Sequence, residues 1–211
     1  MDAIFGNLDL WGQGITYTLL VFFFGGIIAL VLGTIVGAMR VSPVPVARAV
    51  GTAYVTLVRN TPLTLVFFFF VFGYSALALP TLSNLVLGIL AIGVYTATYV
   101  AETLRAGINT VPVGQAEAAR AIGLPFGQVM TQVVLPQAFR SVVPPMMSVF
   151  IALLKNTTVA AGFSIAVLPQ LQSTISNSHT RPGNPLEVLL WVAAIFVALV
   201  MLLTWLQRTL E

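Results

Sequence analysis

The feature that most constrains the fold is the length of the stretches without charge. No Asp, Glu, Lys or Arg occurs between Asp9 and Arg40, and none occurs between Arg59 and Glu102. About 20 apolar helical residues cross a bilayer core of about 30 Å, so the first stretch can hold one membrane-spanning helix and the second can hold two. Only 7% of the residues are charged, against roughly 25% in soluble domains. The sequence therefore predicts an all-α integral membrane protein.

Five transmembrane helices are expected in a single membrane domain, residues 1–211. The turn sequence "ALPTLSN" divides the second uncharged stretch, and Pro144 and Pro145 make the fourth span less regular. Glycines at four positions of the first span predict a close approach of neighbouring helices: Gly25, Gly26, Gly33 and Gly37. Trp191 and Trp205 lie near the two ends of the fifth span, where indoles favour the interface. The expected spans cover about 14–39, 50–77, 85–109, 140–168 and 187–208.

The arginines predict the orientation of these spans. With the N-terminus outside, only Arg181 lies in an outer loop. The others fall on or near the cytoplasmic side, as the excess of Lys and Arg in cytoplasmic connections requires: Arg40, Arg48, Arg105, Arg120, Arg140 and Arg208. The C-terminus and the segment 112–137 are then cytoplasmic. The N-terminal segment before the first span has no Lys or Arg, so we expect it to be retained rather than cleaved as a signal peptide.

Several function classes are disfavoured by what the sequence lacks. There is no cysteine and one histidine, His179, so a zinc cluster is not expected. The net charge of +3 is spread singly along the chain, which fits topology signals better than nucleic-acid binding. No G-x-x-x-x-G-K-[ST] motif is present, so the chain cannot bind ATP by a P-loop. The predicted spans hold no Ser/His or paired-Asp arrangement, which argues against an intramembrane enzyme.

The segment "GQAEAARAIGLPFGQVMTQVVLPQA", residues 114–138, predicts two short helices. Gly123 is placed as a left-handed C-terminal cap of the first helix. Pro136 disfavours helix at the preceding residue and is expected to end the second helix. Each helix has a face at helical spacing. The first is a face of small side chains that could fit into another protein's groove, formed by Gln115, Ala118, Ala119 and Ile122, and the second is an apolar stripe, formed by Phe126, Val129, Met130, Val133 and Val134.

Glu117 and Arg120 are three residues apart and can pair beside the first of these faces. Spacing alone is equally compatible with an amphipathic hairpin that lies on the membrane surface.

The stretch "EAARAIGLPFGQVMTQVVLP" resembles the EAA loop of the integral membrane permeases of ABC importers. That motif is E-A-A, three residues, G, nine residues, I, one residue, L-P, and the matching positions are Glu117, Ala118, Ala119, Gly123, Leu135 and Pro136, with Val133 in place of Ile. Outside the loop, "RNTPL", "YVAETLRAGI" and "LLKNTTV" look like the polar amino-acid branch of these permeases, which carry His, Glu, Gln, Arg or opines. The resemblance covers nearly the whole chain and implies a type I, MetI-like fold with five spans.

The resemblance also implies partners and a location. The chain would be a permease in a bacterial cytoplasmic membrane, with no cofactor of its own, and ATP and Mg²⁺ would be bound by a cytoplasmic ABC ATPase dimer. A second permease subunit, identical or paralogous, and an extracytoplasmic amino-acid-binding protein would complete the importer. The loop would be a coupling helix that docks into a cleft on the ATPase, and its implied ATPase-coupling residues are Glu117, Ala118, Ala119, Arg120 and Gly123.

Charged residues inside the predicted spans suggest a substrate pathway. Glu102 and Lys155 are expected to face the bundle interior, where they could complement the ammonium and carboxylate of an amino acid. The alternative is that Glu102 pairs with Arg105 or Lys155 only to neutralise charge. Pro62 could interrupt the second span and free backbone groups for a ligand. The candidate pathway residues are Arg59, Asn60, Thr61, Glu102, Lys155, Asn156 and Thr157.

For the uncharged candidates, ordinary hydrogen bonding between helices is an equally good interpretation. The excess of bases over acids favours glutamate or glutamine as substrate. An ion-coupled secondary amino-acid transporter stays open as an alternative, although no inverted repeat is apparent. His179 lies in the outer loop "STISNSHTRPGNP", which in importers of the resembling family faces the binding protein.

Overall fold

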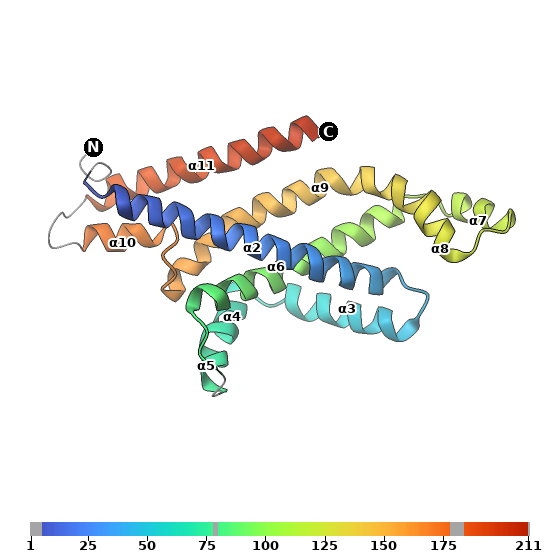
Figure 1. The fold of residues 1–211 in the computed structure, drawn as a ribbon, viewed down its shortest axis with the longest axis horizontal. Coiled ribbons are helices and arrows are strands. Elements are labelled where there is room, and N and C mark those ends of the chain that lie inside the picture. Colours follow the sequence, from blue (N-terminus) through green and yellow to red (C-terminus); the bar gives the residue numbers. More distant parts are fainter. Residues whose placement is uncertain (1–5, 78–79, 178–183, 211) are drawn as a thin grey trace.

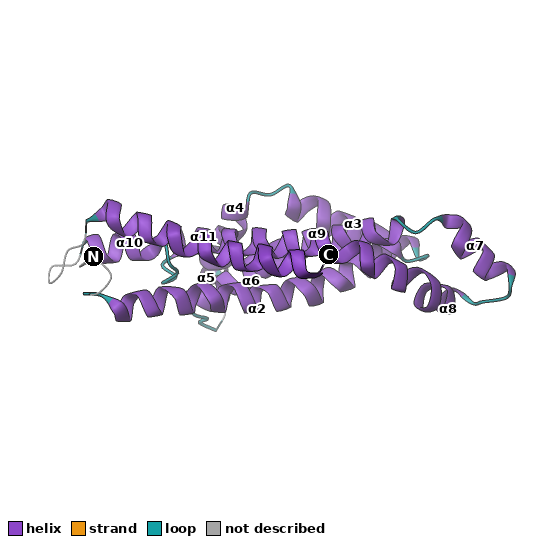
Figure 2. Cartoon of the chain, turned by 90° about the horizontal axis from the view of Figure 1, so that it is seen from above, coloured by secondary structure: helices purple, strands orange, loops and turns teal. Residues whose placement is uncertain are grey.

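The structure is a computed structural model that describes residues 6–77, 80–177 and 184–210. The described residues form an elongated bundle of helices, and no strand occurs among them. The start of α2 (Leu8–Val41) and α10 (Gln170–Ser176) lie at one end, and α7 (Val113–Ala121) and α8 (Phe126–Gln128) project at the other (Figures 1 and 2). The all-α prediction is confirmed. His179 and Arg181 lie outside the described residues.

Four described helices are long and apolar enough to cross a membrane. They are α2, α6 (Asn84–Asn109), a continuous helical run over Phe126–Phe163, and the stretch Pro185–Thr209 of α11 (Pro185–Leu210). These helices contain or overlap the expected spans at 14–39, 85–109, 140–168 and 187–208. The continuous run comprises α8, η2 (Val129–Val134), α9 (Leu135–Asn156) and η3 (Thr157–Phe163).

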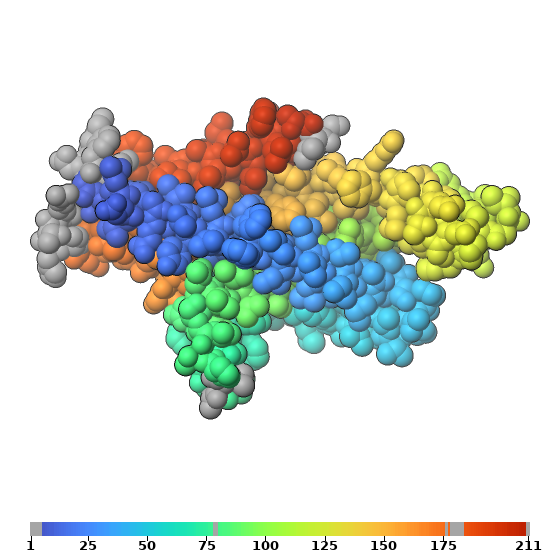
Figure 3. Space-filling model, in the orientation of Figure 1, coloured from blue at the N-terminus to red at the C-terminus, as the bar shows by residue number. Residues whose placement is uncertain are grey.

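The expected second span is broken. In place of one straight helix over 50–77, α3 (Pro45–Arg59) and α4 (Leu63–Phe68) meet at 101°, and η1 (Phe69–Gly73) and α5 (Tyr74–Ala76) continue from α4. The chain turns at residues 60–62, because the ring of Pro62 disfavours helical geometry at the residue before it. The interruption expected at Pro62 is confirmed. The segment formed by α4, η1 and α5 projects from the side of the bundle (Figure 3).

The prediction that Pro136 ends a helix is wrong. Helix continues through Pro136. The segment directly before it, η2, is a π-helix, and its wider turn changes the hydrogen-bonding register at the point where Pro136 has no N–H to donate. The Val133 carbonyl accepts a hydrogen bond of 2.8 Å from the Gln137 side-chain amide, Nε2. The second half of the loop and the fourth span are therefore one helical element.

Small residues bring α2 and α6 together, as the glycines of the first span predicted. A Cβ added to Gly33 would lie 2.5 Å from Val100 Cβ and 2.8 Å from the Ala97 carbonyl oxygen. A Cβ added to Gly25 would lie 2.6 Å from the Ile92 side chain. These backbones pack so closely that only glycine fits at the contacts.

Two further clusters of buried side chains hold the helices together. Phe67 of α4 is fully buried and stacks on Phe163, with ring centroids 5.0 Å apart, which fastens the broken segment to the end of η3. Nearer the start of α2, Trp11 belongs to a buried cluster with Leu171 of α10 and Val188 of α11. Both clusters lie away from α7, which projects at the opposite end of the bundle.

Candidate functional site

The tip of the projecting segment is built around Gly123. This residue has a φ of +88°, which a left-handed backbone requires and L side chains rarely adopt. The Leu124 N–H donates to the Ala119 carbonyl at 3.2 Å and the Gly123 N–H donates to the Arg120 carbonyl at 2.9 Å. This pair of bonds is a Schellman motif, which satisfies the last carbonyls of α7 and reverses the chain. The predicted left-handed cap is confirmed.

Ala119 anchors this tip to the bundle. It is only 6% exposed and packs with Val129 and Val134 of η2 in a buried cluster. Ile108, at the end of α6, and Val111, just after it, pack against the same cluster. The segment is therefore held against both α6 and the long helix over Phe126–Phe163.

The outward face of α7 does not pack into this buried cluster. Glu117, Ala118 and Arg120 are exposed, and Ile122 is 79% exposed. The expected Glu117–Arg120 pair does not form, since neither side chain makes an ion pair with a described residue. Within the predicted docking set, Ala119 thus packs inside the subunit, and the other side chains are available to another protein.

Glu102 is engaged by two arginines. Its carboxylate oxygens accept hydrogen bonds from the Arg40 and Arg105 guanidinium groups, one on each oxygen. The side chains of Arg40 and Glu102 are 12% and 26% exposed. The structure therefore supports the alternative interpretation, charge neutralisation by Arg105, and adds Arg40 from α2, which sequence reasoning used only as a topology signal. No local spacing could have found it, because 62 residues separate Arg40 from Glu102.

A polar cavity of about 380 Å³ lies between α6 and α9. Thr96 is 3% exposed there, and its hydroxyl has no hydrogen-bond partner among the described residues. The Tyr95 and Tyr99 hydroxyls are 2.9 Å apart, and the Arg59 guanidinium carbon lies 5.2 Å from the centroid of the Tyr99 ring. The cavity is lined by Tyr95, Thr96, Tyr99, Ser148, Val149, Ala152, Leu153 and Asn156.

Of the predicted pathway residues, only Asn156 lines this cavity, and Arg59 reaches it through Tyr99. Glu102 lines a separate cavity of about 290 Å³ with Thr110 and Ser141. Sequence reasoning missed Tyr95 and Tyr99, although their i, i+4 spacing in an apolar span is the signal that could have found them.

The remaining candidates lie elsewhere. The prediction that Lys155 faces the bundle interior is wrong, because Leu153 and Leu154 occupy the buried face of α9 and Lys155 is exposed. Thr157 is buried, and its hydroxyl donates to the Leu154 carbonyl at 2.7 Å. The Thr61 hydroxyl donates to the Leu57 carbonyl at 2.8 Å, and Asn60 is exposed at the break between α3 and α4.

Comparison with known proteins gives consistent matches. Residues 29–211 match the family described as binding-protein-dependent transport system inner membrane component. The glutamate transport system permease protein GluC of Corynebacterium efficiens is 42% identical over 187 residues, which cover 83% of this chain and 79% of that protein. The probable glutamine ABC transporter permease protein GlnM of Bacillus subtilis is 37% identical over 181 residues, 82% of each chain.

A solved structure is also similar over nearly its full length. A crystal structure described as an amino acid ABC transporter with histidines superposes with a TM-score of 0.89 at 26% sequence identity. The match covers 99% of this chain and 95% of that one. The fold of nearly the whole chain is therefore similar to that of a solved amino acid ABC transporter.

Proposed function

This chain belongs to the family of binding-protein-dependent transport system inner membrane components, and from that premise we propose how its parts work. It is a membrane permease subunit of an ABC importer for amino acids, with a type I, MetI-like fold. Nothing in the fold or the relatives favours an ion-coupled transporter. Its partners are an ATPase and a substrate-binding protein. In the proposal, two permease subunits, identical or paralogous, enclose the pathway, and ATP and Mg²⁺ are bound by an ATPase dimer.

The observation that carries the proposal is the exposed α7 tip, fixed in shape by Gly123 and braced through Ala119. Glu117, Ala118 and Arg120 form a small, mixed-charge surface that contacts the ATPase, while Ala119 transmits the contact to η2 and α6. The N-terminus lies outside and the C-terminus inside, as the arginine distribution favours, so α7 faces the cytoplasm where the ATPase resides.

The translocation pathway follows the polar side of α6 and α9. The unsatisfied Thr96 hydroxyl, the two tyrosine hydroxyls and Asn156 offer hydrogen bonds to a polar amino acid. Arg59, held over Tyr99, and the exposed Lys155 beside Asn156 supply positive charge near that cavity. Glutamate or glutamine is the proposed substrate, in line with the names of the relatives GluC and GlnM.

The test is reconstitution with the ATPase and binding protein in proteoliposomes. ATP-dependent uptake of labelled glutamate or glutamine is expected, and uptake driven by an ion gradient with this chain alone would contradict the mechanism. Lys155→Glu should shift uptake away from acidic towards basic amino acids, with Arg208→Gln, an exposed change on α11, as control. An unchanged substrate preference would remove Lys155 from the pathway.

A further inference from the structure

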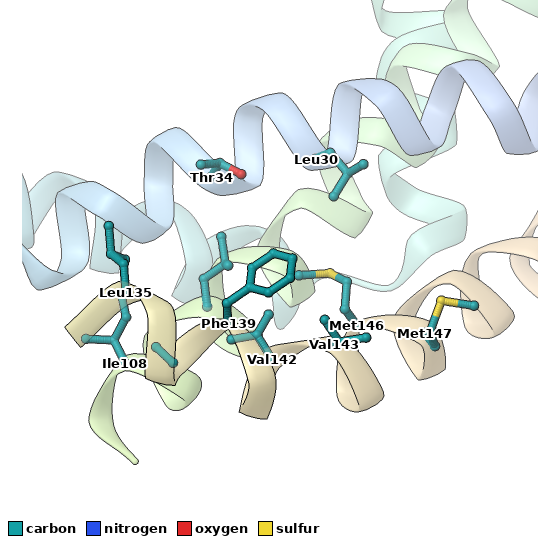
Figure 4. Close-up of a pocket in the computed structure, with 11 residues that line it drawn as sticks. Leu30, Thr34, Ile108, Leu135, Phe139, Val142, Val143, Met146 and Met147 are labelled. Carbon is teal, nitrogen blue, oxygen red and sulfur yellow. The ribbon is translucent and has the colours of Figure 1, made fainter. Parts of the chain in front are cut away.

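An apolar groove opens on the side of the bundle away from the polar cavity. Its first part, about 510 Å³, lies where Leu30 and Thr34 of α2 face Phe139, Val143 and Met146 of α9 (Figure 4). A second part of about 400 Å³ shares its lining at Thr34, Leu104, Ile108 and Leu135. We call this continuous space the α2–α9 groove. Phe139 is 68% exposed and Leu135 is 43% exposed, so the groove is open to its surroundings.

The far end of the groove carries a positive charge. Ser42 and Pro43, in the connection between α2 and α3, line that end. The Arg48 guanidinium donates a hydrogen bond of 2.8 Å to the Ser42 carbonyl, so its charge lies at the mouth of the groove. Arg48 is exposed and makes no ion pair with a described residue. An apolar channel that ends at a free cation complements a molecule with a hydrocarbon tail and an anionic head.

The two sides of α9 are chemically different. Ser148, Ala152 and Asn156 line the polar cavity, whereas Phe139 and Val143 line the groove. A second permease that meets this chain across the polar cavity leaves the groove facing lipid. This step rests on the proposed function, while the apolar lining and Arg48 do not.

We propose that the α2–α9 groove is a binding site for an anionic phospholipid of the cytoplasmic leaflet. One acyl chain lies between α2 and α9 along Ile108 and Phe139, and the phosphate contacts the Arg48 guanidinium. Attraction between an anionic lipid and one basic side chain near a membrane surface amounts to about a fivefold difference in affinity. The charge of Arg48 therefore favours an anionic headgroup, and the apolar groove holds the acyl chain.

Native mass spectrometry of the purified permease–ATPase complex tests this, with no amino acid or nucleotide present. Phosphatidylglycerol and phosphatidylcholine with identical chains are titrated separately. Preferential retention of phosphatidylglycerol is expected, and Arg48→Gln should weaken it about fivefold while weakening phosphatidylcholine binding less, because choline offsets the charge of that phosphate. Arg208→Gln removes an equally exposed charge from α11 and should change neither.

A second variant fills the groove. Thr34→Trp, at a position that lines both parts, should reduce retention of both lipids, whereas Val197→Trp on the exposed side of α11 should not. Equal retention of the two lipids, or phosphatidylglycerol binding unaffected by Arg48→Gln, would overturn the proposal. So would loss of the permease dimer in Thr34→Trp with lipid retention intact, because that result assigns the groove to a second copy of the chain. A failure of amino-acid uptake leaves these measurements unaffected.

Discussion

Replacing Gly123 tests whether the shape of the α7 tip sets the coupling between ATP hydrolysis and transport. A Cβ at Gly123 would meet no atom within 4 Å, so within the subunit a substitution there acts through the backbone. At a φ of +88° a side chain costs about 1–2 kcal/mol, and a β-branched residue is expected at the upper end. Because 1.4 kcal/mol is a factor of ten in an equilibrium, Gly123→Val should lower the ratio of capped to uncapped tips about tenfold.

The expected result is a drop of about tenfold in amino acid transported per ATP hydrolysed, measured in proteoliposomes, with the melting temperature of the bundle unchanged. Gly123→Asn should recover much of the coupling, since Asn tolerates the left-handed region. Gly127→Ala is the matched control: it also has open space around it, but it lies in helical α8 and should leave coupling intact. Normal coupling in Gly123→Val would refute the reasoning.

Three further changes probe the rest of the chain. Gly33→Ala should cost about 1–3 kcal/mol and lower the melting temperature in detergent, because the new methyl group meets Val100 and the Ala97 backbone. Gly12→Ala is the control, since a Cβ there meets no atom within 4 Å. Equal melting temperatures for the two variants would contradict the described packing. Glu102→Gln should lower the melting temperature, because it weakens charge-assisted hydrogen bonds of about 1.5–3 kcal/mol, one of which joins α2 to α6. The KM for uptake should stay unchanged. A raised KM with a normal melting temperature would instead make Glu102 a substrate contact. Thr96→Val should leave the melting temperature unchanged, because no described partner is lost, while raising the uptake KM about threefold to tenfold; an unaltered KM would exclude the Thr96 hydroxyl from the pathway.

The local features of the chain were predictable from sequence. The cap at Gly123 depends on residues within one helical turn, and the interruption at Pro62 follows the disfavouring of helix before proline, although helix continues through Pro136. The glycines of the first span also signalled a close helix contact, because only such a contact repays their conformational cost in a helix.

Features that depend on tertiary context were not predictable. The ion pair between Arg40 and Glu102 joins two helices distant in sequence, and the π-helical turn that carries the chain through Pro136 has no residue signature. Helical spacing put Ala118 and Ala119 on one face of α7, but it could not reveal that Ala119 turns towards Val129 while Ala118 stays exposed.

The unbroken helical run from Phe126 to Phe163 has a mechanical consequence. Its 38 residues, at about 1.5 Å per residue, make a rod about 57 Å long. A rotation of such a rod by one degree about one end displaces the other end by about 1 Å. Val129, which packs against Ala119 of α7, and Asn156, which lines the polar cavity, both lie on this helical run, about 40 Å apart along it. In the proposed mechanism, a movement imposed on the α7 tip would therefore reach Asn156 and the polar cavity through a single helical element.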